Sequence, residues 1–281
     1  MYEEPYRWVE AVGNRRQYLD EQFRQGSPVV GLAYADGVLL LTVSRGTPKL
    51  YEIYDRIGLG GMGHPADLEK LRFSLLEMAH VEGFNRSPSD VTGARMMKYG
   101  LAPVIKQAFE EIFKAPFIVK IILAELGPRP DRDSLLTINY DGTFDEAVGC
   151  AALAATPEAQ TAMIDYLRKT DPLAAAGLDV GLNAALRAWA IGSLAQRQES
   201  DESRGTGATD GSREGKVASQ ALPDEEALRT HLRDALTDRT IECAVLERRA
   251  PGSSKYRALK PDELHALLPP ELQPLLAKRL S

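Results

Sequence analysis

The feature that most constrains the fold is a pair of apolar runs joined by Asp36-Gly37, in the stretch VVGLAYADGVLLLTV at residues 29–43. Asp-Gly between β-rich apolar runs predicts a hairpin, because both turn residues must accept a positive φ. The second run, residues 38–43, is apolar at successive positions, which is typical of a strand buried on both faces. The sheet that holds it must therefore lie between two other layers.

Pairs of helices and groups of strands alternate along the rest of the chain. Further strands are expected at residues 49–58, 117–126, 134–144, 146–154 and 240–249, with a second Asp-Gly hairpin at 141–142. Helices are expected at residues 5–25, 61–84, 87–113 (kinked at Pro103), 157–169, 177–194 and 223–236. The first helix has one apolar stripe, made by Trp8, Val12, Leu19 and Phe23. Two stacked sheets with helices outside each satisfy this order, so we predict an α+β fold, a four-layer αββα sandwich.

We expect a single domain over residues 1–281 with two additions. Residues 196–220 are polar and rich in Gly and Ser, which predicts a flexible insertion. Residues 269–281 are rich in leucine and are expected to form a helical C-terminal tail.

Residues 58–63, GLGGMG, match the dinucleotide-binding pattern G-x-G-x-x-G but not its context. The strands before the motif form an antiparallel hairpin, whereas a dinucleotide fold opens with a parallel βαβ unit. We interpret these glycines as small residues where one backbone passes close to another. The cysteines, Cys150 and Cys243, belong to no Cys/His cluster. The sequence thus predicts no cofactor and no metal site.

Charge and hydropathy limit the possible partners. The net charge is −6 and no run is rich in Lys and Arg, which argues against a nucleic-acid partner. No apolar run approaches the roughly 20 residues that cross a bilayer, and the first residues lack the apolar core of a signal peptide. We therefore expect a cytoplasmic protein without a membrane partner.

Several motifs resemble, in order and spacing, the bacterial 20S proteasome α-type subunit. They are SPVVGLAYADGVLLL, PKLYEIYDRIGLGGMG, DVTGARMMKYG and LLTINYDGTF, together with the last strand and helix at residues 241–268. The resemblance implies the fold of N-terminal-nucleophile hydrolases and a particle of four stacked seven-membered rings, α-β-β-α. In such a particle the β-type subunits cut peptide bonds with an N-terminal threonine. The α-type subunits form the outer rings, narrow the entry pore for unfolded protein substrates and dock a hexameric ATPase or another activator.

Ser27 occupies the position that the resemblance assigns to the nucleophile of β-type subunits. An N-terminal nucleophile uses its own free α-amine as a base, so processing after Gly26 would have to expose Ser27. Pro28 would then be the second residue, and Val43 stands where β-type subunits hold a catalytic acid. These residues and the preceding helix favour a non-catalytic α-type subunit. The alternative is a processed peptidase that uses Ser27.

Lys49 opens the predicted strand KLYEIYDRIG. From spacing alone, a solvated surface lysine is the commoner interpretation. The resemblance instead places Lys49 on the α-subunit lysine that receives the C-terminal carboxylate of an activator, with Gly26 and Gly63 as small residues of the same pocket. The pore gate, in this resemblance, falls to the first residues of the chain, which are Met1, Tyr2, Glu3, Glu4 and Pro5.

Overall fold

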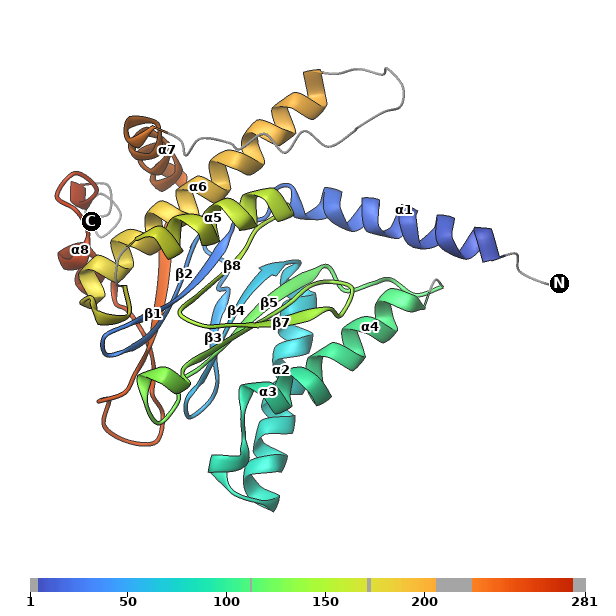
Figure 1. Ribbon diagram of the computed structural model, residues 1–281, viewed down its shortest axis with the longest axis horizontal. Coiled ribbons are helices and arrows are strands. Elements are labelled where there is room, and N and C mark those ends of the chain that lie inside the picture. The colour runs from blue at the N-terminus through green and yellow to red at the C-terminus, as the bar shows by residue number, and fades with distance from the viewer. Residues whose placement is uncertain (1–4, 112, 171–172, 206–223, 275–281) are drawn as a thin grey trace.

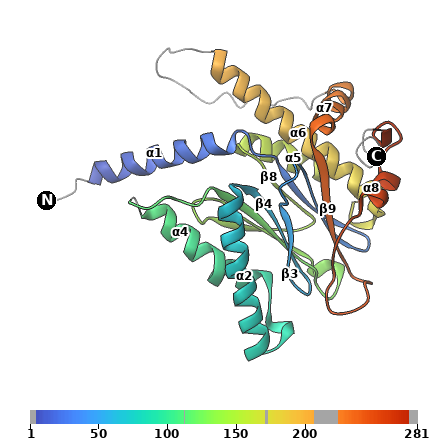
Figure 2. The ribbon, with the colours of Figure 1, turned by 180° about the vertical axis from the view of Figure 1, so that it is seen from behind.

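Two five-stranded antiparallel sheets stack face to face, and helices cover the outer face of each (Figure 1). The computed structural model describes residues 5–111, 113–170, 173–205 and 224–274. The same layers are seen from behind in Figure 2. The predicted four-layer αββα sandwich is confirmed.

The first sheet has the strand order β10-β9-β2-β1-β8. Its strands are β1 (Val29–Tyr34), β2 (Gly37–Ser44), β8 (Cys150–Leu153), β9 (Thr240–Glu247) and β10 (Tyr256–Ala258). The predicted hairpin joins β1 to β2, but its two loop residues are Ala35 and Asp36, because Tyr34 pairs with Gly37. Gly37 is therefore a strand residue, and a Cβ there would lie 1.8 Å from the carbonyl oxygen of Leu246.

The second sheet has the order β3-β4-β5-β6-β7. Its strands are β3 (Leu50–Tyr54), β4 (Ile57–Gly63), β5 (Val119–Glu125), β6 (Ser134–Ile138) and β7 (Phe144–Ala147). The prediction of one strand over KLYEIYDRIG is wrong, since the chain reverses at Asp55-Arg56 and the glycine-rich run forms β4. The predicted strand at 146–154 also divides, because the chain turns at Gly149, with φ +82°, and passes from the second sheet to the first.

Each sheet has its own group of helices. The first sheet is covered by α5 (Pro157–Lys169), α6 (Leu178–Gly205), α7 (Glu225–Asp238) and α8 (Pro261–Leu267). The second is covered by α2 (Pro65–Asn85), α3 (Gly93–Arg95), a π-helical turn (Met96–Leu101) and α4 (Ala102–Glu110). Short 3-10 turns lie at η1 (Pro88–Asp90), η3 (Pro130–Arg132) and η4 (Leu173–Ala175). Pro103 is the second residue of α4, two residues after the π-helical turn ends, and the predicted kink corresponds to this local widening of the helix.

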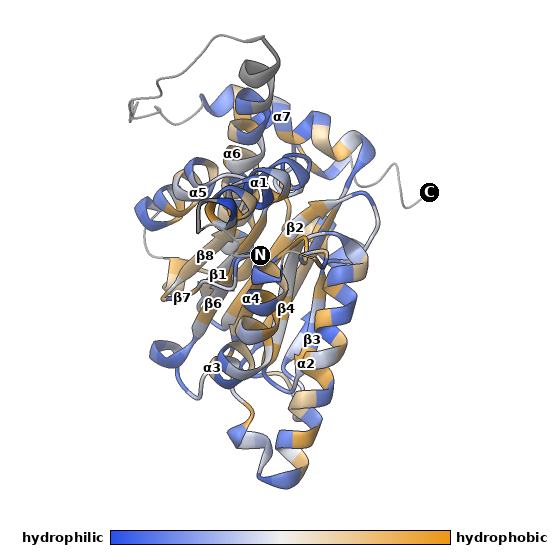
Figure 3. Cartoon of the chain, turned by 90° about the vertical axis from the view of Figure 1, so that its right-hand side faces the viewer, coloured by the Kyte–Doolittle hydropathy of each residue, from blue (hydrophilic) through white to orange (hydrophobic). Residues whose placement is uncertain are grey.

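Strand residues alternate between two apolar layers. Val29, Val38 and Leu40 enter the core between the sheets, whereas Val30 and Leu39 pack against the helices outside. A third apolar cluster joins the second sheet to α2 and α4. Figure 3 shows the apolar strands between the more polar helices. This alternation explains why β2 is apolar at nearly every position.

One predicted segment needs correction, and another lies mostly outside the described residues. Helix α6 continues to Gly205, so the expected flexible insertion at 196–220 is helical in its first part, and residues 206–223 lie outside the described residues. Helix α8 ends at Leu267, and most of the expected tail at 269–281 lies outside the described residues, which end at 274. Leu272, within the described part, is buried against the helices of the first sheet.

Helix α1 (Pro5–Phe23) confirms the predicted N-terminal helix and projects away from the sandwich (Figures 1 and 2). Leu19 and Phe23 at its inner end are fully buried in the core between the sheets. Trp8, at the outer end of the predicted stripe, is 46% exposed. Val12 is partly buried against the same core, so the stripe packs within this chain as far as Val12 and is exposed only at its outer end.

Candidate functional site

Lys49 lies directly before β3, where the two sheets are tied together. The main-chain N–H groups of Lys49 and Leu50 donate to the carboxylate of Glu242 on β9, at 3.0 and 2.8 Å. Burial lowers the pKa of the Lys49 ammonium, and the neighbouring Glu242 opposes that shift. Burial also raises the pKa of Glu242, against the two N–H bonds. Among the ion pairs of the described residues, none includes the Lys49 ammonium.

The structure brings the three predicted pocket residues to the C-terminal end of β4. The N–H of Gly61 donates to the carbonyl of Lys49 at 2.9 Å, and Gly63 follows two residues later. A Cβ on Gly26 would lie 2.4 Å from the side chain of Met62. Lys49, Gly26 and Gly63 therefore surround one short stretch of backbone.

Both glycines have reasons for being small within this chain. Gly63 has φ +132°, and a Cβ there would lie 2.0 Å from the carbonyl oxygen of Ile118. Gly26 is confined by Met62 and by the carbonyl of Phe23. Backbone geometry requires glycine at Gly63, and close packing favours a small residue at Gly26, so these residues by themselves do not indicate a ligand.

The glycine-rich run is a central strand and not a phosphate-binding loop. β4 pairs with β3 on one side and β5 on the other. A Cβ on Gly60 would lie 2.9 Å from Val29 of the facing sheet, and one on Gly61 would lie 2.2 Å from Leu68 of α2. The interpretation of close backbone approach is confirmed at Gly63, which lies against the main chain of Ile118, whereas the close neighbours of Gly60 and Gly61 are side chains. This close packing explains why the run is rich in glycine and so matches the dinucleotide pattern.

Ser27 is a buried structural residue in the intact chain. Its side chain is 7% exposed and donates to the carbonyl of Val43 at 2.5 Å. The indole N–H of Trp189 donates to the same hydroxyl at 2.9 Å. The Val43 side chain, at the position of the β-type catalytic acid, is fully buried. The Ser27 hydroxyl thus both donates and accepts a hydrogen bond within this chain.

Three charged residues at the base of α1 were not predicted. Arg15 donates to the carbonyls of Phe109 and Glu111, both at 2.9 Å, and so binds the C-terminal end of α4. Asp20 accepts a hydrogen bond from the hydroxyl of Tyr140 at 2.8 Å. These contacts fix the inner end of α1 on the sandwich.

Lys120 on β5 is the third such residue and is 6% exposed. Its ammonium donates to the carbonyls of Ala154 and Ala155, at 2.9 and 3.2 Å, and lies 4.9 Å from the centre of the Phe23 ring. Burial lowers the pKa of Lys120 to about 8. The signal in the sequence was a single lysine inside the apolar run FIVKIILAEL.

The remaining predictions concern the gate, metal binding and the membrane. Residues 1–4 of the expected gate are outside the described residues, and Pro5 begins α1. Within the described ranges, no group of three or more His, Cys, Asp or Glu side chains is placed to hold a metal ion. The same ranges contain no helix with the length and hydropathy to cross a membrane.

Comparisons with known proteins match the sequence of this chain to one family. The model of the family described as "Proteasome subunit" matches residues 23–176. The "Proteasome subunit alpha" of Actinosynnema mirum is 31% identical over 258 residues, which is 91% of this chain and 83% of the relative. The protein of the same name from Streptomyces coelicolor is 29% identical over 63% of this chain and 70% of the relative. The one from Streptosporangium roseum is 34% identical over 52% of this chain and 56% of the relative. With its αββα sandwich and these matches, the chain belongs to the proteasome subunit family.

Proposed function

We propose that this chain is the non-catalytic α-type subunit of a 20S proteasome core particle. It forms the outer seven-membered ring against β-type subunits in the cytoplasm, gates the entry of unfolded proteins and docks a hexameric ATPase. The observation that carries the proposal is Ser27, whose hydroxyl is buried and hydrogen-bonded on both sides. Relatives named "Proteasome subunit alpha" give independent support.

The surroundings of Ser27 argue against catalysis by this chain. An N-terminal nucleophile needs a free α-amine beside its hydroxyl. Ser27 is instead preceded by Gly26 and by α1, whose inner end is packed into the core. Removing α1 would take Leu19 and Phe23 out of that core, and each fully buried side chain of this size contributes about 1.5–3 kcal/mol. A disposable propeptide does not require such packing.

Lys49 is the residue we assign to the activator. Its half-buried ammonium has lost solvation without gaining an ion pair in the described part of the chain, so an incoming carboxylate would be attracted to it. Gly26 and Gly63 border the same stretch of β4, where an extended tail could reach main-chain groups. The first five residues, Met1–Pro5, adjoin the outer end of α1 and are the proposed gate.

Exposed apolar side chains support assembly with other subunits. Trp8 on α1 is 46% exposed, Phe84 at the end of α2 is 91% exposed, and Phe113 after α4 is 96% exposed. Single apolar residues are common at protein surfaces, so these three support the proposal only as candidate contact residues.

The proposal is tested by co-expression with a proteasome β-type chain. N-terminal sequencing should find this chain beginning at Met1 or Tyr2, and native mass measurement should give seven copies per outer ring. Peptide hydrolysis should require the β-type threonine. A chain that begins at Ser27 and hydrolyses peptides without the β-type partner would overturn the proposal in favour of the processed peptidase.

A further inference from the structure

A second site lies at the opposite end of the β3–β4 hairpin from Lys49. A pocket of about 360 Å³ opens where the β3–β4 turn, η1, the segment after β5 and the β9–β10 loop meet. Three cationic residues line it: Arg56, Arg248 and Lys255. Its volume is within the range of small-molecule sites.

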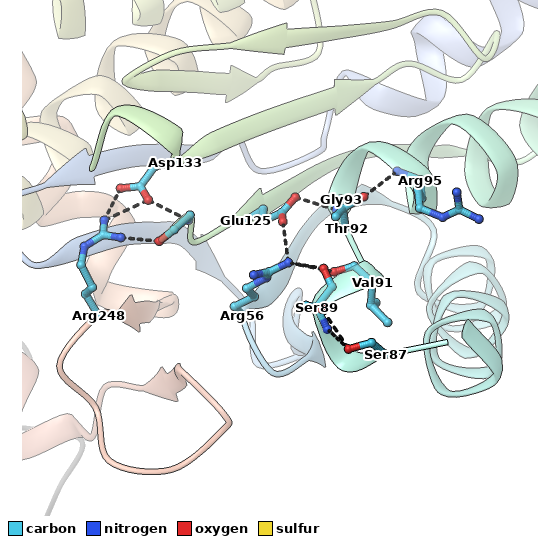
Figure 4. Close-up of polar contacts among 11 residues, drawn as sticks. Arg56, Ser87, Ser89, Val91, Thr92, Gly93, Arg95, Glu125, Asp133 and Arg248 are labelled. Carbon is cyan, nitrogen blue, oxygen red and sulfur yellow. Dashed lines mark hydrogen bonds and ion pairs between the residues drawn. The ribbon is translucent and has the colours of Figure 1, made fainter. Parts of the chain in front are cut away.

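Carboxylate and carbonyl groups of the protein hold the two arginines in place. Arg248 donates to both carboxylate oxygens of Asp133, at 2.9 and 2.7 Å, and to the carbonyl of Gly127 (Figure 4). Arg56 lies 3.5 Å from the carboxylate of Glu125 and donates to the carbonyl of Ser89 at 3.0 Å.

The carboxylates that fix these arginines do not line the pocket. The side chain of Asp133 is 5% exposed and that of Glu125 is 14% exposed. Both therefore lie on the protein side of the guanidinium groups, which are positioned without being covered on the pocket side. A rigid guanidinium binds an oxyanion with little loss of side-chain entropy.

Lys255 supplies the charge that has no partner carboxylate. Its ammonium donates to the carbonyls of Ala250 and Gly252, at 2.6 and 3.0 Å. No ion pair of the described residues includes Lys255, and Asp55 is the one carboxylate among the residues that line the pocket. In addition, the Nε atoms of Arg56 and Arg248 are buried without a hydrogen-bond partner in the described structure.

We propose that this pocket binds a small oxyanion, a phosphate or carboxylate group of a low-molecular-weight ligand. The oxyanion would lie between Lys255 and the pocket-facing edges of the two guanidinium groups, where it would accept charge-assisted hydrogen bonds. Lys255 provides the net attraction, and the fixed arginines provide directional donors. The proposal does not depend on the proteasome role, since the site is separate from Lys49.

The test is titration of the full chain with inorganic phosphate and, in a second arm, with citrate, at ionic strength held constant with sodium chloride. Isothermal titration gives the Kd, and thermal unfolding gives an independent readout because a ligand of the folded state raises Tm. Lys255→Gln should weaken binding about tenfold or more, the size expected for one charge-assisted hydrogen bond.

Two further variants separate binding from folding and from general charge. Ser253→Glu changes an exposed lining residue, with no side-chain bond recorded in the described structure, and puts a carboxylate into the pocket. It should weaken binding at least as much as Lys255→Gln. Arg249→Gln removes the same charge from the same loop, but that side chain is 90% exposed and does not line the pocket, so binding should be unchanged.

Each outcome decides the proposal. Binding of phosphate but not citrate, or the reverse, supports it and identifies the ligand class. Stabilisation by both anions no greater than by chloride overturns it. Wild-type affinity in Ser253→Glu, or equal weakening in Arg249→Gln, also overturns it, even if Lys255→Gln does not fold.

Discussion

Glu242→Ala should destabilise the chain strongly and disturb the start of β3. The carboxylate accepts the main-chain N–H groups of Lys49 and Leu50, and Leu50 is 6% exposed. Leaving a buried donor without an acceptor costs about 1–3 kcal/mol. The buried N–H of Leu50 loses its acceptor outright, while that of half-buried Lys49 can be hydrated in part. We therefore expect a loss of about 2–4 kcal/mol in the free energy of unfolding.

The assay is urea unfolding followed by circular dichroism, at a concentration where the chain is monomeric. Glu242→Gln keeps one acceptor oxygen and should lose about half as much as the alanine variant. Glu52→Ala is the matched control, because this glutamate on β3 is exposed and substitution at such sites changes stability by less than about 0.5 kcal/mol. If Glu242→Ala and Glu52→Ala unfold at the same urea concentration, the carboxylate does not tie the sheets together and the reasoning is refuted.

Four further predictions concern single positions. Lys49→Ala, in the complete particle, should leave basal peptide hydrolysis intact and reduce ATPase-stimulated degradation. Arg45→Ala, at an exposed position in the same loop, should leave both activities unchanged. Equal stimulation of the two variants would remove Lys49 from the proposed site. Ser27→Ala should leave hydrolysis by the particle unchanged and lower stability by about 1–3 kcal/mol, since two buried partners lose their hydrogen bonds; abolished hydrolysis would restore the nucleophile hypothesis. Asp133→Ala should cost about 3 kcal/mol in urea unfolding, because it leaves a half-buried arginine without its carboxylate; a neutral result would mean that water replaces the pair. The pKa of Lys120 is lowered to about 8, so as the pH rises the folded chain releases this proton before the unfolded chain does, and stability should rise with pH above 8. Between pH 8 and 10 the free energy of unfolding of the wild type should increase by about 2 kcal/mol relative to that of Lys120→Met. Parallel pH profiles of the two proteins would contradict this.

Most of the fold followed from patterns that are local in the sequence. The apolar run at 38–43 required cover on two sides, and the structure places it between the second sheet and the helices. The helix expected at residues 61–84 is present as α2, and its apolar positions Leu68, Leu71, Leu75 and Ala79 form the buried face. Period and turn chemistry were sufficient for these elements.

The errors share a different cause, which is that long-range packing decided the local structure. β4 was missed because four glycines disfavour a strand by propensity, but the facing sheet and α2 approach too closely for larger residues. The helical part of 196–220 was missed because its composition is polar, although its first residues continue a helix already packed on the first sheet. The division of 146–154 between two sheets has no local signal except Gly149.

The resemblance pointed to Lys49 but not to the residues that hold it in place. Lys49 was singled out from the resemblance, whereas Glu242 is 193 residues away and nothing near it in the sequence marks its role. Nothing in the sequence singles out Arg15 or Asp20. Their partners are carbonyl and hydroxyl groups on distant segments, which only the fold brings together.

The attachment of α1 gives this helix the mechanics of a lever. Contacts near Arg15, Leu19 and Phe23 hold its inner end, and the outer half projects from the body of the sandwich (Figure 1). At a rise of 1.5 Å per residue, the axis from Arg15 back to Pro5 is about 15 Å long. A rotation of about 5° at Arg15 would therefore move the first turn by about 1.3 Å. The direction of the outer turn of α1 is therefore set by side chains at its base, about 15 Å away.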